Sequence, residues 1–273
     1  MRDSNDLRGW ATLNLAGHAL RADLRQGISL ALEQRFDTTQ PAAFGAAPAR
    51  SEALDVPGFT ARVATGASCN CSTLTLTPHC NGTHTECVGH LTVEPLDAQQ
   101  VVPTAPLLAV LLTVSVVPEA ADRLVTHTAL AEGWQRALQG VPRSLQPRAL
   151  IVRTLPNDPG KRSRNYDATG AAYLTPAAAH WLVEQGIEHL IVDLPSLDRM
   201  QDGGALAAHR IFFGLPAGGT RLADAQRAHC TATELAFIPD DVHDGLWLLW
   251  LQVPALAGDA VPSRPLLHAV QLP

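Results

Sequence analysis

The segment from Thr77 to His90 concentrates side chains of the kind that bind metal ions. Three of the eleven histidines, His79, His84 and His90, fall within twelve residues, and Glu86 stands between the last two. A single histidine is more often an ordinary surface or core residue than a ligand. Imidazole and carboxylate together, however, are the ligand set of catalytic zinc and manganese. The spacing therefore predicts a site for a divalent metal ion.

The backbone of this segment decides which of its side chains can meet. The stretch before Glu86 is rich in threonine, so we expect an extended chain, in which residues two apart share a face. His84 and Glu86 should then point the same way. His79 is five residues before His84, which would place it on the opposite face unless a bulge or tight kink lies between them. The direction of His90 stays open because Gly89 precedes it.

Four cysteines lie in or just before this segment, at Cys69, Cys71, Cys80 and Cys87. They raise two alternatives: a structural zinc site, or a Cys-His nucleophile. Their spacing lacks the paired C-x₂₋₄-C pattern of structural zinc sites, and no nucleophile elbow is recognisable. We therefore favour a catalytic metal site, and whether Cys80 or Cys87 is a ligand stays open.

Strands and helices that could position this segment alternate along the chain. Pro176 after Thr175 is typical of a helix start, with the threonine side chain as the N-cap. Apolar runs predict strands, and periodic apolar residues predict helices. The predicted strands are within residues 22–33 and at 55–67, 73–77, 107–117, 149–153, 187–194, 231–236 and 246–254; the predicted helices are at 119–140, 176–185 and 205–213. A loop is expected from Phe36 to Arg50, and Trp247 and Trp250 are expected in the core. This order indicates one α/β domain over residues 1–273.

Composition excludes several classes of partner. The formal net charge is −6, and the longest basic run is the short Lys161–Arg164, so nucleic acid is not expected to bind. The sequence contains no apolar run of the length that a membrane span needs. Residues Met1 to Trp10 have no apolar stretch of the kind an export signal carries, so we expect a cytoplasmic protein with reduced thiols.

The metal-binding segment also resembles a known family. Residues Gly82 to His90 are similar to the His-x-Gly-Thr-His-x-Asp-x-Pro-x-His signature of the cyclase family of metal-dependent hydrolases, which includes bacterial kynurenine formamidase and isatin hydrolase. Looser similarity continues at residues 22–28, 192–198, 204–210, 231–235 and 262–265. The resemblance implies a swivelling β/β/α fold, zinc or manganese as one or two ions, and a homodimer or larger homo-oligomer.

The resemblance also implies roles for individual residues. His84 and Glu86 match ligands of the signature, and His79 matches the remaining one. His209 and Glu234 match the ligands that come from later in the chain, and His90 matches the histidine that transfers protons.

This sequence departs from the signature at three points. Glu86 replaces an aspartate, Val88 replaces a proline, and the spacing between His79 and His84 is one residue longer. Phe44 is the aromatic residue nearest to the place of a tryptophan in the formamidases, and we expect it to contact substrate.

A function follows from these residues. Water activated by the metal is expected to attack an amide, formamide or cyclic amide carbonyl of a small molecule, in an arylformamidase-like reaction, while His90 moves the proton to the leaving nitrogen. Asp193, Ser196 or Asp198 is expected to orient His209. The alternative is a non-catalytic relative that binds a metal or a small ligand, which the replacement by Glu86 and the longer spacing motivate.

Overall fold

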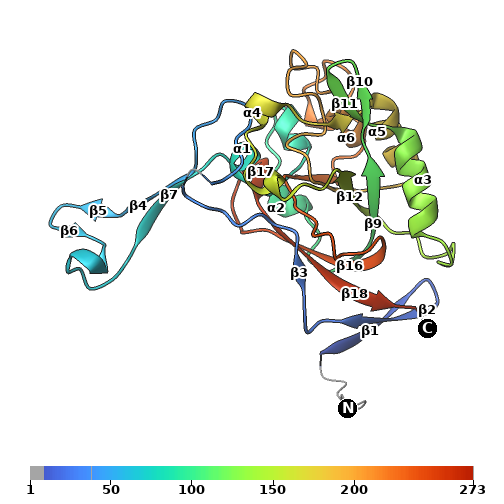
Figure 1. Ribbon diagram of the computed structural model, residues 1–273, viewed down its shortest axis with the longest axis horizontal. Coiled ribbons are helices and arrows are strands. Elements are labelled where there is room, and N and C mark those ends of the chain that lie inside the picture. The colour runs from blue at the N-terminus through green and yellow to red at the C-terminus, as the bar shows by residue number, and fades with distance from the viewer. Residues whose placement is uncertain (1–8, 38, 273) are drawn as a thin grey trace.

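The computed structural model describes residues 9–37 and 39–272, so most of the N-terminal stretch expected to lack an export signal, Met1–Trp10, lies outside the described residues. Eleven strands of this described part form one sheet (Figure 1). From edge to edge, ten of them are β1 (Trp10–Leu15), β2 (His18–Asp23), β18 (Arg264–Gln271), β16 (Gly245–Gln252), β9 (Leu107–Ser115), β12 (Ala149–Leu155), β14 (His189–Val192), β15 (Thr231–Glu234), β8 (His84–Glu86) and β17 (Ala260–Pro262), while β3 (Ile28–Ser29) pairs with β18.

The centre of the sheet is parallel and its two sides are antiparallel. The four central strands, β9, β12, β14 and β15, are parallel to one another. Their residues are almost all buried. Such strands need both faces covered, and for that reason they read as continuous apolar runs in the sequence. Beyond β15 the direction reverses, and β8 lies antiparallel between β15 and β17. This edge of the sheet carries the metal-binding segment.

Helices cover one face of the sheet. The helix α3 (His127–Ala137) packs on β9, and α5 (Pro176–Glu184) packs between α3 and α6 (Ala207–Phe213). Thr175 caps α5 as expected, because its hydroxyl accepts a hydrogen bond from the amide of Ala178 at 3.1 Å. The other face packs on a second apolar cluster around Ile151, Trp247 and Leu267.

Short elements complete the fold. The short α-helices are α1 (Pro78–Asn81), α2 (Ala98–Val101) and α4 (Tyr166–Thr169), and the 3₁₀ helices are η1 (Val63–Thr65), η2 (Val88–Leu91), η3 (Pro159–Ser163) and η4 (Leu222–Asp224). A three-stranded sheet consists of β10 (Val117–Glu119), β11 (Asp122–Val125) and β13 (Tyr173–Leu174). None of the described helices combines the length and the apolar content that a membrane crossing requires.

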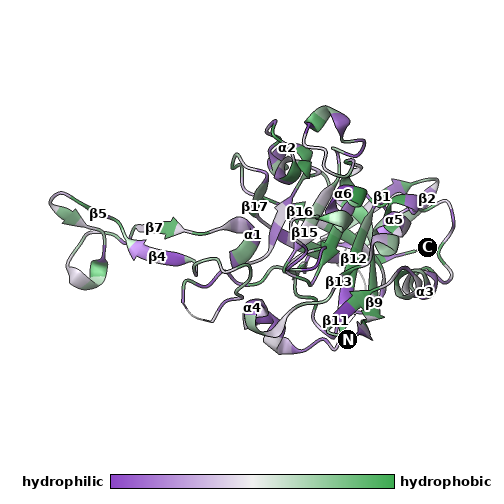
Figure 2. Cartoon of the chain, turned by 90° about the horizontal axis from the view of Figure 1, so that it is seen from above, coloured by the Kyte–Doolittle hydropathy of each residue, from purple (hydrophilic) through white to green (hydrophobic). Residues whose placement is uncertain are grey.

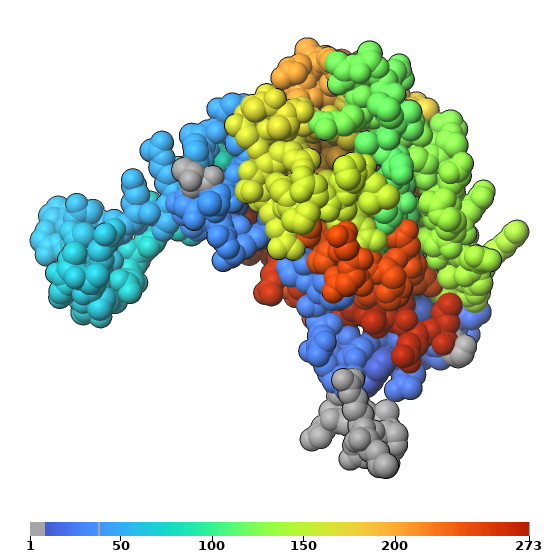
Figure 3. All heavy atoms as spheres, viewed as in Figure 1, coloured from blue at the N-terminus to red at the C-terminus, as the bar shows by residue number. Residues whose placement is uncertain are grey.

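One segment projects from the body as an arm, which we define as residues 50–75. It contains two separate two-stranded sheets, β4 (Arg50–Ala53) with β7 (Ser72–Thr75) and, between them in the chain, the hairpin of β5 (Asp55–Val56) with β6 (Phe59–Thr60). The arm extends away from the main sheet in both ribbon views and forms a separate knob in the space-filling view (Figures 1, 2 and 3). Its strands therefore lack a packed core.

Several sequence-based expectations need correction. The helix predicted over residues 119–140 starts only at His127, because residues 117–125 form the hairpin of β10 and β11. The strand expected within residues 22–33 is interrupted, with β2 ending at Asp23 and β3 covering two residues. Trp247 is buried at 3% exposure, but Trp250 is 37% exposed, because its side chain lies on the other face of β16.

Candidate metal centre

The segment that carries the histidines is less extended than its sequence suggests. Residues 78–81 form the single helical turn α1, so His79 is helical and no β-bulge separates it from His84. Pro78 suits the first position of a helix, and the side chain of Asn81 holds the turn by accepting a hydrogen bond from the amide of Thr77 at 2.7 Å. Of the two expected alternatives, a bulge or a tight kink, the structure has a tight helical turn, which brings His79 to the same side as His84.

Strand pairing brings the late carboxylate to the early histidine. In the antiparallel register of β8 and β15, His84 stands directly opposite Glu234, and Glu86 stands opposite Ala232. Opposed residues in such a pair project to the same face of the sheet. The Nε2 atom of His84 is accordingly 3.4 Å from Oε2 of Glu234, and both side chains are buried.

His209 reaches this pair from the helix α6. Its Nε2 lies 2.9 Å from Oε1 of Glu86 and 3.3 Å from Oε1 of Glu234. Asp198 fixes the ring from behind, since its Oδ2 is 2.7 Å from Nδ1 of His209. The same carboxylate accepts hydrogen bonds from the amides of Ala208 and His209 at the start of the helix.

Of the three residues expected to orient His209, Asp198 is the one in contact with it. Asp193 instead forms a buried ion pair with Lys161 at 2.8 Å, and Ser196 accepts a hydrogen bond from the amide of Asp198.

The hydrogen bonds around the histidines leave one nitrogen of each ring ready for a cation. Nδ1 of His84 is 3.0 Å from the carbonyl oxygen of Gly82, which can only accept, so Nδ1 carries the proton and Nε2 is left with a lone pair. In the same way, the carboxylate of Asp198 keeps the proton on Nδ1 of His209 and leaves its Nε2 with a lone pair. Within residues 9–37 and 39–272, hydrogen-bond partners are lacking for the buried Nε2 atoms of His79, His84 and His209 and for both carboxylate oxygens of Glu86.

The spacing of these atoms fits a bound metal ion. Two donor atoms bound to one ion at about 2.1 Å, at tetrahedral or octahedral angles, lie roughly 3.0–3.4 Å apart. Across the cluster, imidazole nitrogens lie 2.9 to 3.4 Å from carboxylate oxygens without forming hydrogen bonds. Burying such polar atoms unpaired is costly, and the donor atoms of His84, Glu86 and Glu234 lie close enough together to hold one divalent ion. His209 and His79 contact the carboxylates of this group.

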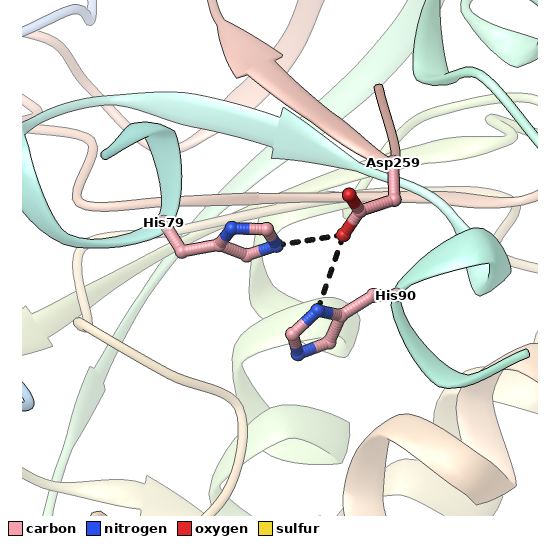
Figure 4. A group of neighbouring side chains, drawn as sticks. All are labelled: His79, His90 and Asp259. Carbon is pink, nitrogen blue, oxygen red and sulfur yellow. Dashed lines mark hydrogen bonds and ion pairs between the residues drawn. The ribbon is translucent and has the colours of Figure 1, made fainter. Parts of the chain in front are cut away.

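A further carboxylate, which the sequence reasoning missed, lies beside His79 and His90. Oδ2 of Asp259 is 3.1 Å from Nε2 of His79 and 3.3 Å from Nδ1 of His90, and both rings point toward it (Figure 4). Asp259 directly precedes β17, which pairs with β8. In the sequence it stands 169 residues after His90 without a motif around it. Its place next to a predicted C-terminal strand was the available signal.

The carboxylates and imidazoles shift one another's pKa. Burial alone would lower the pKa of His209, but Glu86, Asp198 and Glu234 raise it well above its ordinary value. The pKa of His84 is raised against the effect of burial by Glu234 and Glu86. Burial would raise the pKa of Glu234, but the two imidazoles hold it well below its usual range. This negative cluster attracts protons to its histidines, and a divalent cation would compete with those protons.

A cavity of about 460 Å³ opens onto the cluster. Its wall includes His79, Glu86, His90, His209 and Glu234, and it also includes apolar side chains from two loops. Those side chains are Phe44, Met200 and Leu206. Phe44 adopts a left-handed backbone conformation with φ +59° and is partly exposed. The structure thus places the predicted substrate contact on the wall of the same cavity as the predicted metal ligands.

The cysteines are not arranged as a zinc site. All five are free, and Cys69 and Cys71 are exposed in the arm. Cys87 donates a hydrogen bond to the carbonyl oxygen of Leu96, and burial raises the pKa of its thiol to about 11. Burial also raises the pKa of Cys80, which lines the cavity. Both thiols are thereby disfavoured in the thiolate form that binds metal.

Comparison with known proteins relates this fold to one family. The sequence profile of a family described as "Putative cyclase" matches residues 23–199. The match ends before His209, Glu234 and Asp259. Among curated protein sequences, none matches the chain.

Solved structures extend the likeness to nearly the whole chain. A predicted metal-dependent hydrolase from Bacillus stearothermophilus is 15% identical, with a TM-score of 0.57 over 89% of this chain and 98% of that one. An isatin hydrolase bound to the product analogue thioisatinate is 16% identical, with a TM-score of 0.55 over 82% of each chain. Isatin hydrolase A from Labrenzia aggregata, bound to benzyl benzoate, is 14% identical, with a TM-score of 0.55 over 89% of this chain and 93% of that one. The α/β fold predicted from the sequence is confirmed.

Proposed function

Because the chain belongs to the cyclase family, we propose that it is a metal-dependent hydrolase that cleaves a C–N bond in an amide, formamide or cyclic amide. The observation that carries this proposal is the convergence of His79, His84 and Glu86 with His209 and Glu234. The Nε2 atoms of the three histidines and both oxygens of Glu86 lack hydrogen-bond partners in the described part of the chain. Of the reactions known for such folds, an arylformamidase-like one suits the apolar side of the cavity.

The residues of the cluster have separate tasks in this proposal. A zinc or manganese ion would be held by His84, Glu86, His209 and Glu234. His79 lies on the other side of Glu86, because its Nε2 faces Oε2 of that carboxylate, whereas His209 faces Oε1. A bound divalent ion lowers the pKa of water from 15.7 to about 7 and polarises a carbonyl oxygen. Glu86 could contact both sides of the site, because its two oxygens face different histidines. Its Oε1 lies 2.9 Å from Nε2 of His209, and its Oε2 lies 3.4 Å from Nε2 of His79.

His90 is the proposed proton carrier. Its Nδ1 contacts Asp259, which leaves Nε2 free to give a proton to the leaving nitrogen. Burial would lower the pKa of His90, but Asp259 and Glu86 raise it, so the ring takes up protons readily. Phe44, Met200 and Leu206 would contact the apolar part of the substrate.

Two measurements on the same preparation test the proposal. Metal content and hydrolysis of N-formylkynurenine, isatin and simple cyclic amides are measured before and after chelation and after metal is restored. We expect bound zinc or manganese and a turnover that follows metal content. Metal without turnover of any of these compounds would support the non-catalytic alternative, and absence of both would refute the metal site.

We further propose that the chain assembles as a homodimer or larger homo-oligomer through its arm. A two-stranded hairpin without a packed core is marginally stable in water. The arm nevertheless exposes Phe59 and Leu74 at 37% and 53%. In a symmetric dimer each arm would pack these side chains on the partner copy. The arm leads directly into the helix α1 that carries His79, so this contact would also lie near the cavity.

Light scattering during gel filtration tests the assembly. We expect a homo-oligomer for the parent chain and a smaller species for the double substitution Phe59→Asp and Leu74→Asp. Val93→Asp, at an exposed apolar position outside the arm, should leave the size unchanged. A monomeric parent chain would contradict the proposal.

A further inference from the structure

Asp259 is placed beside the metal cluster by the sheet and by a network of backbone hydrogen bonds. Its carbonyl oxygen accepts a hydrogen bond from the amide of Cys87 at 3.0 Å, and the amide of Gly258 donates to Asp97 at 2.9 Å. Its neighbour Ala260 stands opposite Glu86 in the pairing of β17 with β8. The carboxyl group is therefore fixed next to Glu86.

Gly89 allows this close approach. A Cβ atom at Gly89 would lie 2.4 Å from the carbonyl oxygen of Leu96 and 3.3 Å from the Cβ of Asp259. Any larger residue there would collide with the backbone at Leu96 and crowd the side chain of Asp259. The backbone around His90 thus leaves room for the acid.

The contact between Asp259 and His79 has the geometry of two ligands rather than of a hydrogen bond. Nε2 of His79 is 3.1 Å from Oδ2 of Asp259 and 3.4 Å from Oε2 of Glu86, yet it forms no hydrogen bond within the described residues. These separations fall in the roughly 3.0–3.4 Å range expected for two donors on one ion. His79, Glu86 and Asp259 are therefore spaced as three ligands of one ion would be.

The charges around the cluster favour more than one cation. The ion pairs that Glu86, Glu234 and Asp259 form within the described part of the chain are all with histidines. With Asp198, which contacts His209, the cluster has four carboxylates, and two divalent ions would balance their charge.

We propose that Asp259 is a metal ligand that, together with His79 and Glu86, forms a second ion position in this chain. This inference rests on the proposed function, because Glu86 is shared with the ion that His84, His209 and Glu234 would hold. The second position is the outer one. The side chains of His79 and Asp259 are 25% and 39% exposed, whereas those of His84 and Glu234 are 0% and 4% exposed.

The outer ion should exchange with solvent first. Chelation is therefore expected to remove the two ions in two steps, with the outer ion lost at the lower chelator concentration. Asp259 also contacts Nδ1 of His90 at 3.3 Å. The alternative to a role as metal ligand is therefore that Asp259 only positions His90 for proton transfer.

The test is the number of metal ions per chain, with Asp259→Asn compared with the parent. The whole chain is equilibrated with Mn²⁺ or Zn²⁺ and freed of excess metal, and its metal content is measured by mass spectrometry. We expect about two ions per chain in the parent and about one in Asp259→Asn. Asp241→Asn, an exposed acid with no assigned contact, should retain about two ions per chain and serves as the matched control.

Electron paramagnetic resonance gives a second readout that does not depend on activity. Two Mn²⁺ ions that share Glu86 should show magnetic coupling, and Asp259→Asn should show an uncoupled ion. If Asp259→Asn does not fold, which melting of the metal-free protein would reveal, Asp259→Ser is used in its place.

The outcomes separate this inference from the function it rests on. A parent chain without any bound metal would overturn both. A parent chain with a single ion, or a substituted chain that keeps both ions and their coupling, would overturn the second position alone. In that last case Asp259 would be left as a positioning residue for His90.

Discussion

Glu234 stands directly opposite His84 in the antiparallel pair of β15 and β8, with its Oε2 3.4 Å from Nε2 of the imidazole. The two residues are 150 positions apart in the sequence, and the register of a sheet, not a loop, holds them together. Both side chains are buried. A pair fixed in this way has little freedom to adjust when a ligand is changed.

Glu234→Gln should therefore weaken metal binding strongly. The amide has nearly the same size as the carboxylate, but it lacks the charge that balances the cation. We expect the affinity to fall by at least about 100-fold, a loss at the upper end of that seen when a group supporting a ligand is removed. Competition with a chromophoric chelator measures it. An unchanged affinity would mean that Glu234 is not a ligand.

Asp198→Asn separates the orientation of His209 from the stability of α6. The oxygen of asparagine can still accept the hydrogen bond from the amide of Ala208 at the start of α6, so the melting temperature of the metal-free protein should fall only modestly. The amide cannot supply the negative charge beside Nδ1 of His209, and metal affinity should fall about 10- to 100-fold.

Asp202→Asn is the matched control for this change. Asp202 accepts hydrogen bonds from the amides of Gly204 and Leu206 in the same loop, without contacting a histidine. Equal losses of metal affinity in both variants would indicate that the loop, and not the orientation of His209, is responsible.

His90→Ala should reduce turnover while leaving the ion of the buried cluster in place. Removal of a proton-transfer group costs about 10²- to 10⁴-fold in rate. His180→Ala, at an exposed position on α5, is the matched control. Rates on the best substrate and metal content are measured together. If His90→Ala removed the ion held by His84 and Glu234, His90 would be a ligand of that ion instead.

His189 should make the protein less stable as the pH falls. Burial lowers its pKa from 6.5 to about 4, and its Nδ1 is 2.9 Å from the hydroxyl of Thr231. Below about pH 6.5 the unfolded chain binds a proton that the folded chain does not bind until about pH 4, so the stabilising effect of folding with a neutral ring is lost in that range. Between about pH 7.5 and about pH 5 this residue should cost about 2 kcal/mol of unfolding free energy.

The comparison of His189→Gln with the parent isolates this contribution. Glutamine can keep a hydrogen bond to Thr231 but does not titrate. Urea unfolding at the two pH values should show a smaller pH-dependent loss in the variant than in the parent. Identical losses would place the pH sensitivity elsewhere in the chain.

The local sequence predicted correctly those elements that are buried on all sides or that begin at a clear cap residue. The strands β9 and β12 are buried on both faces, so their apolar runs were unambiguous, and α5 begins at the predicted cap residue Thr175. The convergence of His84 and Glu86 with His209 and Glu234, expected from the resemblance, is also found in the structure.

Other features depend on contacts that no local pattern contains. Residues 119–125 have the composition of a helix start, but β11 pairs with β13, and this distant contact makes them a hairpin. The helical turn at His79 depends on Pro78 and on the side chain of Asn81. The position of Asp259 depends on β17 pairing with a strand that is far earlier in the chain.

The place of β8 between β15 and β17 has a consequence for how the protein is made. Residues 84–86 leave the ribosome long before either neighbouring strand exists, and pairings so distant in sequence form late. A nascent chain therefore exposes its early histidines without their carboxylate partners until translation has passed Pro262. A cation held by the whole cluster would therefore require a chain synthesised at least as far as Pro262.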